Sequence, residues 1–367
     1  MTIGCPKEQK IDEFRVGLTP ENTASLVEEG HVVFVEKDAG VGSGFSDADY
    51  EKAGANIVLD AKELYSSARL IVKVKEPQKA EYDLLDEAHT LFCYLHLAPV
   101  PELVSVLLEK RVCAIAYETV AIGEQLPLLK PMSEIAGKMA PLVGAFHLSR
   151  FEGGEGLLIS GADGVSSANV LVIGAGNVGY NAAKIAFGMG ANVTVINRSS
   201  PKLEKLLETL PDVKTALYSE QKLKEELLDA DIVISTVLIH GGATTPKLIT
   251  REMLKSMKNG TVLVDVTIDQ GGISEASRPT THRDATFMQE GVLHYCVANM
   301  PGAYPKTATV ALCNATFSYV KKLANEGTVD AIKADASLAL GVNVYKGEVT
   351  NEAVAEVLGL AFKELKL

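Results

Sequence analysis

The sequence contains no tryptophan and has few aromatic residues of any kind. Phenylalanine, tyrosine and tryptophan make up 6% of the 367 residues. Nucleic-acid modules that stack bases on a sheet of aromatic side chains need more rings than this, so we expect no such module. A surplus of basic residues is also missing, because 35 lysines and arginines face 47 aspartates and glutamates, for a formal charge of −12. Binding to polyanions needs a basic surface that this composition does not favour.

Paired cysteines are missing as well. The five cysteines are scattered without a CxxC pair, so the sequence predicts neither a disulfide framework nor a structural zinc site. Cys93 and His96 form a CxxH pair, but no two further ligands lie nearby in the sequence, and we expect no metal site.

Long apolar segments are absent. No uncharged apolar run approaches the roughly 18 residues that would cross a bilayer. The N-terminal residues have no apolar core of a secretory signal. We therefore expect a cytoplasmic protein with no membrane partner and no nucleic-acid partner.

The composition that remains is that of an ordinary globular protein. Hydrophobic residues make up 47% and charged residues 22%, which is enough for a sizeable core. At roughly 150 residues per domain, the length indicates about two domains. Strand-like and helix-like segments alternate, which predicts an α/β fold with doubly wound parallel sheets. Strands are expected at 31–36, 69–75, 90–96 and 112–118 in the first half, and at 169–174, 192–197, 214–218, 231–237, 261–266 and 292–297 in the second.

Segments with helical spacing separate or follow these strands, at 19–30, 101–111, 178–189, 220–230, 308–325 and 329–338. A longer helix is expected at 132–151, with Pro141 as a potential kink, and it is a plausible connection between two domains. The residues from about 306 either close a third domain or return to the first one. They end in an extended pair, at 341–345 and 348–350, and a last helix.

The most specific local motif is the glycine-rich stretch VLVIGAGNVGYNAAK. The apolar run before Gly174 predicts a strand, and helical spacing follows Gly179. Gly174 permits a tight turn, Gly176 lets a pyrophosphate approach the backbone, and Gly179 lets the helix pack closely on the strand. The start of the helix, at Asn177 and Val178, would supply amide donors to the phosphates. The stretch therefore predicts a dinucleotide-binding site.

Residues at the end of the next predicted strand should contact the ribose of the dinucleotide. A typical NAD site has an aspartate or glutamate there, whereas this chain has Asn197, Arg198 and Ser199. A carboxylate repels a 2′-phosphate, but an arginine with flanking hydroxyls can pair with one. NAD is one expectation and NADP is the other, because Arg198 could equally point into solvent.

Five polar residues are candidates for chemistry, although each alone has a simpler structural interpretation. Oxidation of an amino acid explains them together. Arg15 would hold the substrate carboxylate in bidentate fashion and Lys75 would hold it as a point charge, while His96 would take and return protons. Lys75 and His96 each end a predicted strand, where functional groups of open parallel sheets gather. Asp269 would orient the ammonium or a water near the nicotinamide, and Asn299 follows the last strand close to both ligands.

Several stretches together closely resemble the alanine dehydrogenase / pyridine nucleotide transhydrogenase family over nearly the whole chain. They are IGCPKE at 3–8, RVGLTP at 15–20, GVGSGFSD at 40–47, VKEP at 74–77, YLHLA at 94–98, PMSEIAGKMA at 131–140, the glycine-rich turn, IDQGG at 268–272, RPTTH at 278–282 and HYCVANMPGA at 294–303.

The resemblance to alanine dehydrogenase implies oxidative deamination of L-alanine to pyruvate and ammonium, the reverse amination, and a homo-oligomer, usually a hexamer. It implies a substrate domain of residues 1–130 and 306–367, around an inserted Rossmann domain of residues 131–305. His96 and Asp269 would be catalytic, and Arg15, Lys75 and Asn299 would bind substrate. Further residues match cofactor positions of the family, namely Ser133, Asn197, Lys202, Ser219, Val297 and Met300. Asn197 with Arg198 departs from the family's usual aspartate followed by an apolar residue, so strict NAD specificity is open.

Three other readings remain. One is a soluble nucleotide-binding component of a proton-translocating transhydrogenase, and another is a lysine-type dehydrogenase with a longer substrate. The third is a dinucleotide sensor without catalysis. Retention of Arg15, Lys75, His96 and Asp269 together favours the amino-acid enzyme.

Overall fold

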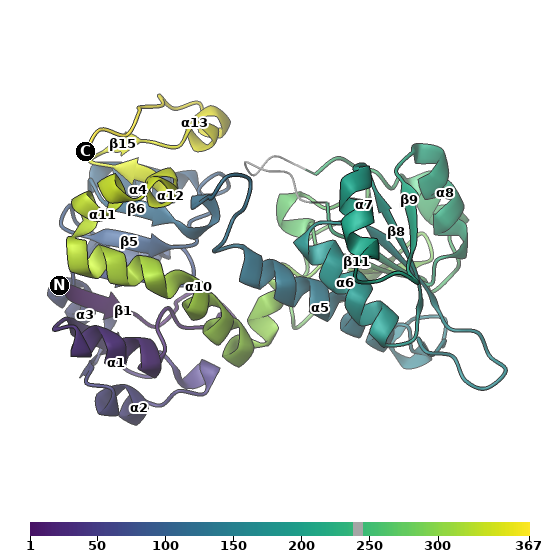
Figure 1. Cartoon of the computed structure of the whole chain (residues 1–367), viewed down its shortest axis with the longest axis horizontal. Helices are drawn as coiled ribbons and strands as arrows, with labels where there is room; N and C mark the ends of the chain where they lie inside the picture. The colour runs from purple at the N-terminus through teal and green to yellow at the C-terminus, as the bar shows by residue number, and fades with distance from the viewer. Residues whose placement is uncertain (238–244) are drawn as a thin grey trace. The chain divides into compact units, whose positions relative to one another are not determined.

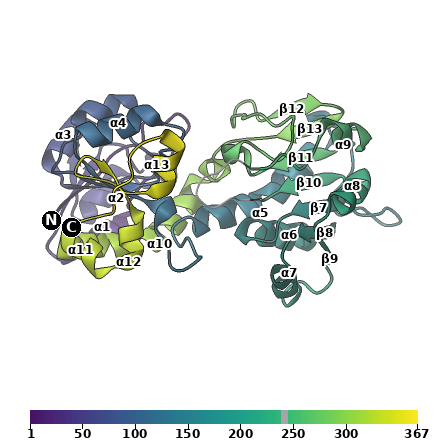
Figure 2. The ribbon, with the colours of Figure 1, turned by 90° about the horizontal axis from the view of Figure 1, so that it is seen from above.

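A computed structural model describes residues 1–237 and 245–367 of the chain (Figure 1). The chain divides into two compact units, of which the first joins Met1–Met132 to Tyr304–Leu367 and the second is Ser133–Ala303. Figures 1 and 2 both show the yellow C-terminal segments packed beside the purple and blue N-terminal ones. Both ends of the chain therefore build the first unit, and each unit is described below by itself.

Within the described residues, the first unit contains an eight-stranded sheet in the order β15-β14-β6-β5-β4-β1-β2-β3. Its strands are β1 (Thr2–Cys5), β2 (Val32–Glu36), β3 (Asn56–Val58), β4 (Leu70–Val72), β5 (Thr90–Cys93), β6 (Cys113–Ala116), β14 (Val342–Tyr345) and β15 (Glu348–Val349). The pairs from β3 to β6 are parallel, whereas β14 runs antiparallel to both β6 and β15. Lys346 and Gly347, with φ of 48° and 84°, form the two-residue hairpin loop that reverses the chain.

Helices cover this sheet and connect its strands. They are α1 (Pro20–Glu28), α2 (Asp47–Lys52), α3 (Ala61–Ser67), α4 (Pro101–Glu109), α10 (Pro305–Glu326), α11 (Thr328–Ala334), α12 (Ala336–Gly341) and α13 (Glu352–Leu358), with short 3₁₀ turns η1 (Val41–Ser43), η2 (Lys79–Leu84) and η3 (Tyr117–Thr119). The prediction of one helix at 329–338 is wrong, because Asp335 leaves the helical conformation. Its side chain instead accepts hydrogen bonds from the amides of Ser337 and Leu338 and begins α12.

The second unit contains a seven-stranded sheet, counted within the described residues, in the order β12-β13-β11-β10-β7-β8-β9. Its strands are β7 (Asn169–Ile173), β8 (Asn192–Asn197), β9 (Lys214–Leu217), β10 (Ile232–Ser235), β11 (Val262–Asp265), β12 (Thr286–Gln289) and β13 (Val292–Tyr295). Only the β12–β13 pair among them is antiparallel. If the six parallel strands are numbered in chain order without β12, their order from β9 to β13 is 3-2-1-4-5-6, that of a doubly wound dinucleotide-binding sheet.

The described part of the second unit contains the helices α6 (Asn177–Gly188), α7 (Ser200–Leu207), α8 (Glu220–Asp229) and α9 (Arg251–Ser256), with 3₁₀ turns η4 (Arg150–Glu152), η6 (Ile268–Gln270) and η7 (Met300–Ala303). The long helix α5 (Lys130–His147) contains Pro141 and covers most of the helix predicted at 132–151, but it ends at His147, before the separate turn η4. It lies mostly in this unit. A side chain at Gly137 would come within 2.4 Å of the Val178 carbonyl oxygen, so a glycine is needed where α5 passes α6.

The central strands of both sheets are buried on both faces, as their apolar runs predict. The prediction of an α/β fold with two doubly wound, largely parallel sheets is confirmed. No helix in residues 1–237 and 245–367 is long and apolar enough to cross a membrane.

Candidate active site

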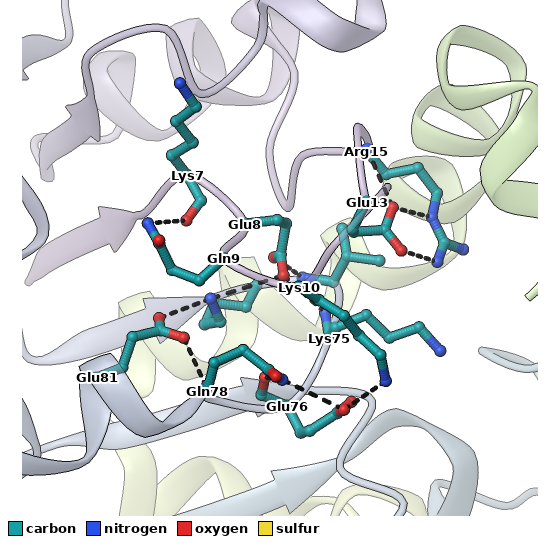
Figure 3. Close-up of polar contacts among 12 residues, drawn as sticks. Lys7, Glu8, Gln9, Lys10, Glu13, Arg15, Lys75, Glu76, Gln78 and Glu81 are labelled. Atoms are coloured by element: carbon teal, nitrogen blue, oxygen red, sulfur yellow. Dashed lines mark hydrogen bonds and ion pairs between the residues drawn. The ribbon is translucent and has the colours of Figure 1, made fainter. Parts of the chain in front are cut away.

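Arg15 is held by a carboxylate two residues earlier in the chain (Figure 3). Its Nε and Nη2 donate to the two oxygens of Glu13, at 2.6 and 2.5 Å, and its Nη1 lies 3.0 Å from the sulfur of Met132. Arg15 is only 2% exposed. Burial alone would raise the pKa of Glu13, but the hydrogen bonds and charge of Arg15, with the charge of Lys75, hold it at about 2. The pair is therefore ionised, and Glu13 occupies the guanidinium edge that we expected the substrate to take.

Lys75 lies in the loop after β4, three residues beyond Val72, so the prediction that it ends the strand is wrong. Beyond the strand, the Lys73 amide still donates to the Phe92 carbonyl at 3.1 Å, but the next two amides donate to a side chain. The amides of Val74 and Lys75 donate to the two carboxylate oxygens of Glu8, at 2.7 and 3.3 Å. The Lys75 ammonium lies 5.9 Å from the centre of the Tyr94 ring, within reach of a cation–π contact.

His96 is likewise three residues beyond its strand, β5, rather than at the strand's end. It adopts a left-handed φ of 44°, and its amide donates to Glu118 at 2.6 Å. Its ring stacks on Tyr94, with centroids 5.8 Å apart and an angle of 6° between the planes, and its side chain is 44% exposed. Nδ1 lies 3.8 Å from Glu118. The imidazole is thus oriented by one carboxylate while remaining open to solvent.

Tyr94 is a site residue that our sequence reasoning missed. Its ring contacts both Lys75 and His96, and its hydroxyl donates to the Leu128 carbonyl at 2.6 Å. The signal was present, because Tyr94 stands two residues before His96 and alternate residues of an extended segment share a face. The first unit therefore gathers Lys75 and His96 around one buried ring, and the charge of Lys75 also reaches Glu13, the partner of Arg15.

In the second unit, the glycine-rich turn connects β7 to α6 as predicted. Gly174 has a φ of 109°, and a side chain at Gly179 would come within 2.0 Å of the Gly174 carbonyl oxygen. A side chain at Gly176 would meet nothing within 4 Å. The first and third glycines are therefore required by the fold itself, and the second leaves open space at the start of α6, where Asn177 is exposed. This geometry fits a dinucleotide pyrophosphate.

Asn197 lies at the end of β8, beside the turn. Its Oδ1 accepts from the amide of Ala175 at 3.2 Å, and its Nδ2 donates to the Ser199 carbonyl at 3.0 Å. Arg198 is exposed. Asn197 therefore joins the glycine-rich turn to the segment that we expect to read the ribose.

Other predicted cofactor residues have varied surroundings. Lys202 and Ser219 are exposed, Val178 and Ser133 are half-buried, and Val297 and Met300 are buried. Ser219 caps α8, because its hydroxyl accepts from the amide of Lys222. In the structure, Ser219 therefore serves as the N-cap of α8.

The loop after β11 carries Asp269, which is exposed in η6. Asp265, fully buried, organises this loop by accepting from the Thr267 hydroxyl at 2.7 Å, the Ile273 amide at 2.9 Å and the Ser277 hydroxyl at 2.5 Å. Asn299 follows β13 with a left-handed φ of 59°. Asp269 and Asn299 belong to the second unit, and Arg15, Lys75 and His96 belong to the first.

Within residues 1–237 and 245–367, no group of three or more histidine, cysteine, aspartate or glutamate side chains is arranged so that it could hold a metal ion. The chain thus has two doubly wound units. One carries a dinucleotide-type turn, and the other carries an arginine, a lysine and a histidine near one another. This combination defines the class of two-domain dinucleotide-dependent enzymes.

Comparison with known proteins narrows that class to one family. Residues 4–136 match the family model described as alanine dehydrogenase/PNT, N-terminal domain, and residues 140–352 match its C-terminal domain. The chain belongs to this alanine dehydrogenase/PNT family, which confirms the resemblance noted from the sequence.

Individual relatives agree with this assignment. The chain is 50% identical to an alanine dehydrogenase of Halomonas elongata over 366 residues, which cover 99% of this chain and 98% of that protein. A solved structure of an L-alanine dehydrogenase superposes with a TM-score of 0.94 at 44% identity, covering 98% of this chain and 99% of the other. A transhydrogenase from Sinorhizobium meliloti superposes with a TM-score of 0.81 at 25% identity, covering 96% and 100%.

Proposed function

We propose that this chain catalyses the oxidative deamination of L-alanine to pyruvate and ammonium, with hydride transfer to a nicotinamide cofactor, and the reverse reductive amination. The observation that carries the proposal is similarity to alanine dehydrogenases over the full chain, together with retention of Arg15, Lys75, His96 and Asp269. A transhydrogenase component or a dinucleotide sensor would bind a cofactor without needing that polar set.

Turnover tests the proposal directly. The purified chain is supplied with L-alanine and with NAD or NADP, and formation of the reduced nicotinamide is followed by its near-ultraviolet absorbance. We expect reduction that depends on alanine, and release of pyruvate and ammonium in equal amounts. If neither cofactor is reduced when alanine is added, the proposal is wrong. Lysine in place of alanine tests for a longer substrate.

The residues of the first unit would bind and prepare the substrate. Lys75 and Arg15 attract the carboxylate, and Glu13 keeps the Arg15 guanidinium fixed in its buried position. The bound nicotinamide supplies the acceptor for the hydride that leaves Cα. His96 has Nδ1 facing Glu118, so we assign Nε2 to the proton transfers that accompany imine hydration and release of ammonium. Asp269 orients the ammonium or the attacking water, and Asn299 lies with it on the second unit.

The second unit would bind the cofactor, and its residues fit a dinucleotide. The open space at Gly176 and the amides at the start of α6 suit a pyrophosphate. NAD is the family expectation. We propose that NADP is also accepted, because Arg198 replaces the usual apolar residue and Asn197 replaces the carboxylate that would repel a 2′-phosphate.

Two variants separate these contributions to the ribose site. Asn197→Asp adds a negative charge beside the ribose, and Arg198→Ile removes the positive one. Each should lower the ratio of kcat/KM for NADP to that for NAD, by about tenfold for a charge contact of about 1.4 kcal/mol. An unchanged ratio in Arg198→Ile would mean that Arg198 does not contact the phosphate.

The remaining parts of the proposal concern organisation. We assign substrate binding to residues 1–130 and 306–367 and cofactor binding to residues 131–305, in a cytoplasmic homo-oligomer that is a hexamer. Light scattering on the purified protein measures the mass of the assembly, and a monomer would contradict it.

A further inference from the structure

Glu8 is a buried carboxylate whose contacts lead to the substrate-binding loop. It follows β1, and its side chain is 2% exposed. Oε1 accepts from the amide of Val74 at 2.7 Å, and Oε2 accepts from the amide of Lys75 at 3.3 Å. Figure 3 shows Glu8 and Glu13 on neighbouring parts of the N-terminal loop, with Lys75 beside them. One side chain thus binds two successive amides of the segment that carries Lys75.

We propose that Glu8 is a positioning residue for the proposed reaction. By holding the backbone of Val74 and Lys75, it fixes the direction in which Lys75 extends toward the substrate carboxylate. This inference rests on the proposed function for the role of Lys75. The contact itself links two stretches, IGCPKE and VKEP, which lie far apart in the sequence.

A purely structural role for Glu8 would be to neutralise the fully buried Lys73. Burial lowers the pKa of Lys73, and the charges of Glu8 and Glu81 outweigh that effect, so Glu8 does contribute to this role. The distances nevertheless show that Glu81 makes the closer contact. The Lys73 ammonium lies 2.7 Å from Glu81 but 3.6 Å from Glu8. Glu81 also accepts from the Tyr65 hydroxyl at 2.9 Å, so it is the closer and better anchored partner of Lys73. The shortest contact of Glu8 goes instead to the Val74 amide.

Several charges surround Glu8. Burial and the negative charges of Glu13 and Glu81 raise its pKa, the charge of Lys73 and the hydrogen bond from the Val74 amide lower it, and the net result is a pKa of about 7. Either protonation state keeps an acceptor oxygen for the Val74 amide. The backbone contact therefore does not require an ionised Glu8.

Glu81 offers a matched control. Glu8→Gln keeps the size of the side chain but replaces one acceptor oxygen by a donor, so one of the two amides loses its partner. Glu81→Gln weakens the other contact of Lys73 and leaves the amides of Val74 and Lys75 untouched. Both variants should lower the unfolding temperature.

Kinetics then separate positioning from stability. A displaced Lys75 would weaken its contact with the substrate carboxylate, so we expect Glu8→Gln to raise KM for L-alanine and for pyruvate by about tenfold. KM for the dinucleotide should stay unchanged, and Glu81→Gln should leave KM for alanine as it is. In a Lys75→Ala background, Glu8→Gln should add no further increase, because the two changes act through the same side chain.

Hydrogen–deuterium exchange provides a readout that needs no activity. The peptide containing Val74 and Lys75 should exchange faster in Glu8→Gln than in the parent or in Glu81→Gln. Unchanged exchange there, an equal rise of KM for alanine in both variants, or fully additive effects with Lys75→Ala would each overturn the inference. If the parent chain does not oxidise alanine, the proposed function fails, and exchange alone still decides whether Glu8 fixes the loop.

Discussion

Arg15, which we propose to bind the substrate, shows how a guanidinium can be kept charged inside a protein. A buried guanidinium without a partner is costly, and Glu13 offsets part of that cost with two hydrogen bonds to one edge. The same contact fixes the rotamer of Arg15 before any ligand arrives. In the proposed function, Lys75 would provide the net positive charge that attracts the substrate carboxylate, because Glu13 neutralises Arg15, and Arg15 would add a guanidinium whose position is already set. With a net charge of −12 on the chain, such local cations must provide the attraction for anionic substrates.

His96→Ala tests the proposed acid–base role at the scale of one side chain. General acid–base catalysis contributes about 10² to 10⁴ in rate, so kcat for alanine oxidation should fall within that range. The Kd of the dinucleotide, measured by fluorescence or calorimetry, should stay near that of the parent. His31→Ala serves as a control outside the site and should leave kcat unchanged. A comparable loss of dinucleotide affinity in His96→Ala would instead make His96 a structural residue.

At the scale of elements, the sequence predicted those features that local patterns specify. The strand expected at 192–197 matches β8 residue for residue, and the glycine-rich turn connects a strand to a helix as expected. Short elements such as α2 and β3 were missed, because six or three residues carry too little periodicity.

The contacts that orient the candidate site could not be predicted from the sequence, for a different reason. Glu8 reaches Lys75 across 67 residues, and Glu118 reaches His96 across 22. Such contacts depend on which strands are neighbours in the sheet, which residue spacing alone does not determine. Beyond Val72 and Cys93, one more amide of each segment donates to a backbone carbonyl, and the following amides donate to carboxylates. The same contacts therefore shape both loops.

Asp335→Ala tests why the single helix predicted at 329–338 is divided into α11 and α12. Asp335 accepts from the amides of Ser337 and Leu338 and from the Lys322 ammonium. Loss of an N-cap costs about 0.5–2 kcal/mol of stability, which denaturant unfolding at neutral pH should show. Asp330→Ala in α11, where no cap is lost, is the control and should cost less.

The pH dependence of that difference follows from the pKa of Asp335. Partial burial opposes ionisation, but hydrogen bonds from Ser337 and Lys322 outweigh it and lower the pKa below 3.8. The contribution of the ionised cap is therefore present above pH 3.8 and is lost as pH falls through the lower, folded-state value. The gap in stability between the parent and Asp335→Ala should narrow at acid pH. A gap that widens there would contradict the cap.

At the scale of the whole chain, the two ends meet next to a candidate substrate residue. Helix α10 packs against α1, η1 and β4, all from the N-terminal part. Its Thr309 hydroxyl accepts from the amide of Val16 at 3.1 Å and lies 2.7 Å from the hydroxyl of Ser43. Val16 directly follows Arg15, so a segment nearly three hundred residues further along the chain holds the loop that presents the guanidinium.

Thr309→Val tests this link between the chain ends. The substitution keeps the shape of the side chain and leaves the buried amide of Val16 without its acceptor, which costs about 1–3 kcal/mol. We expect lower stability toward denaturant and a higher KM for alanine, because the loop of Arg15 loses a fixed point. Thr316→Val lies on the same helix, is equally buried, and interrupts only a 3.4 Å contact to Cys313 within that helix. The control should therefore leave KM for alanine unchanged, and an equal effect of the two variants would show that α10 supports the fold without orienting Arg15.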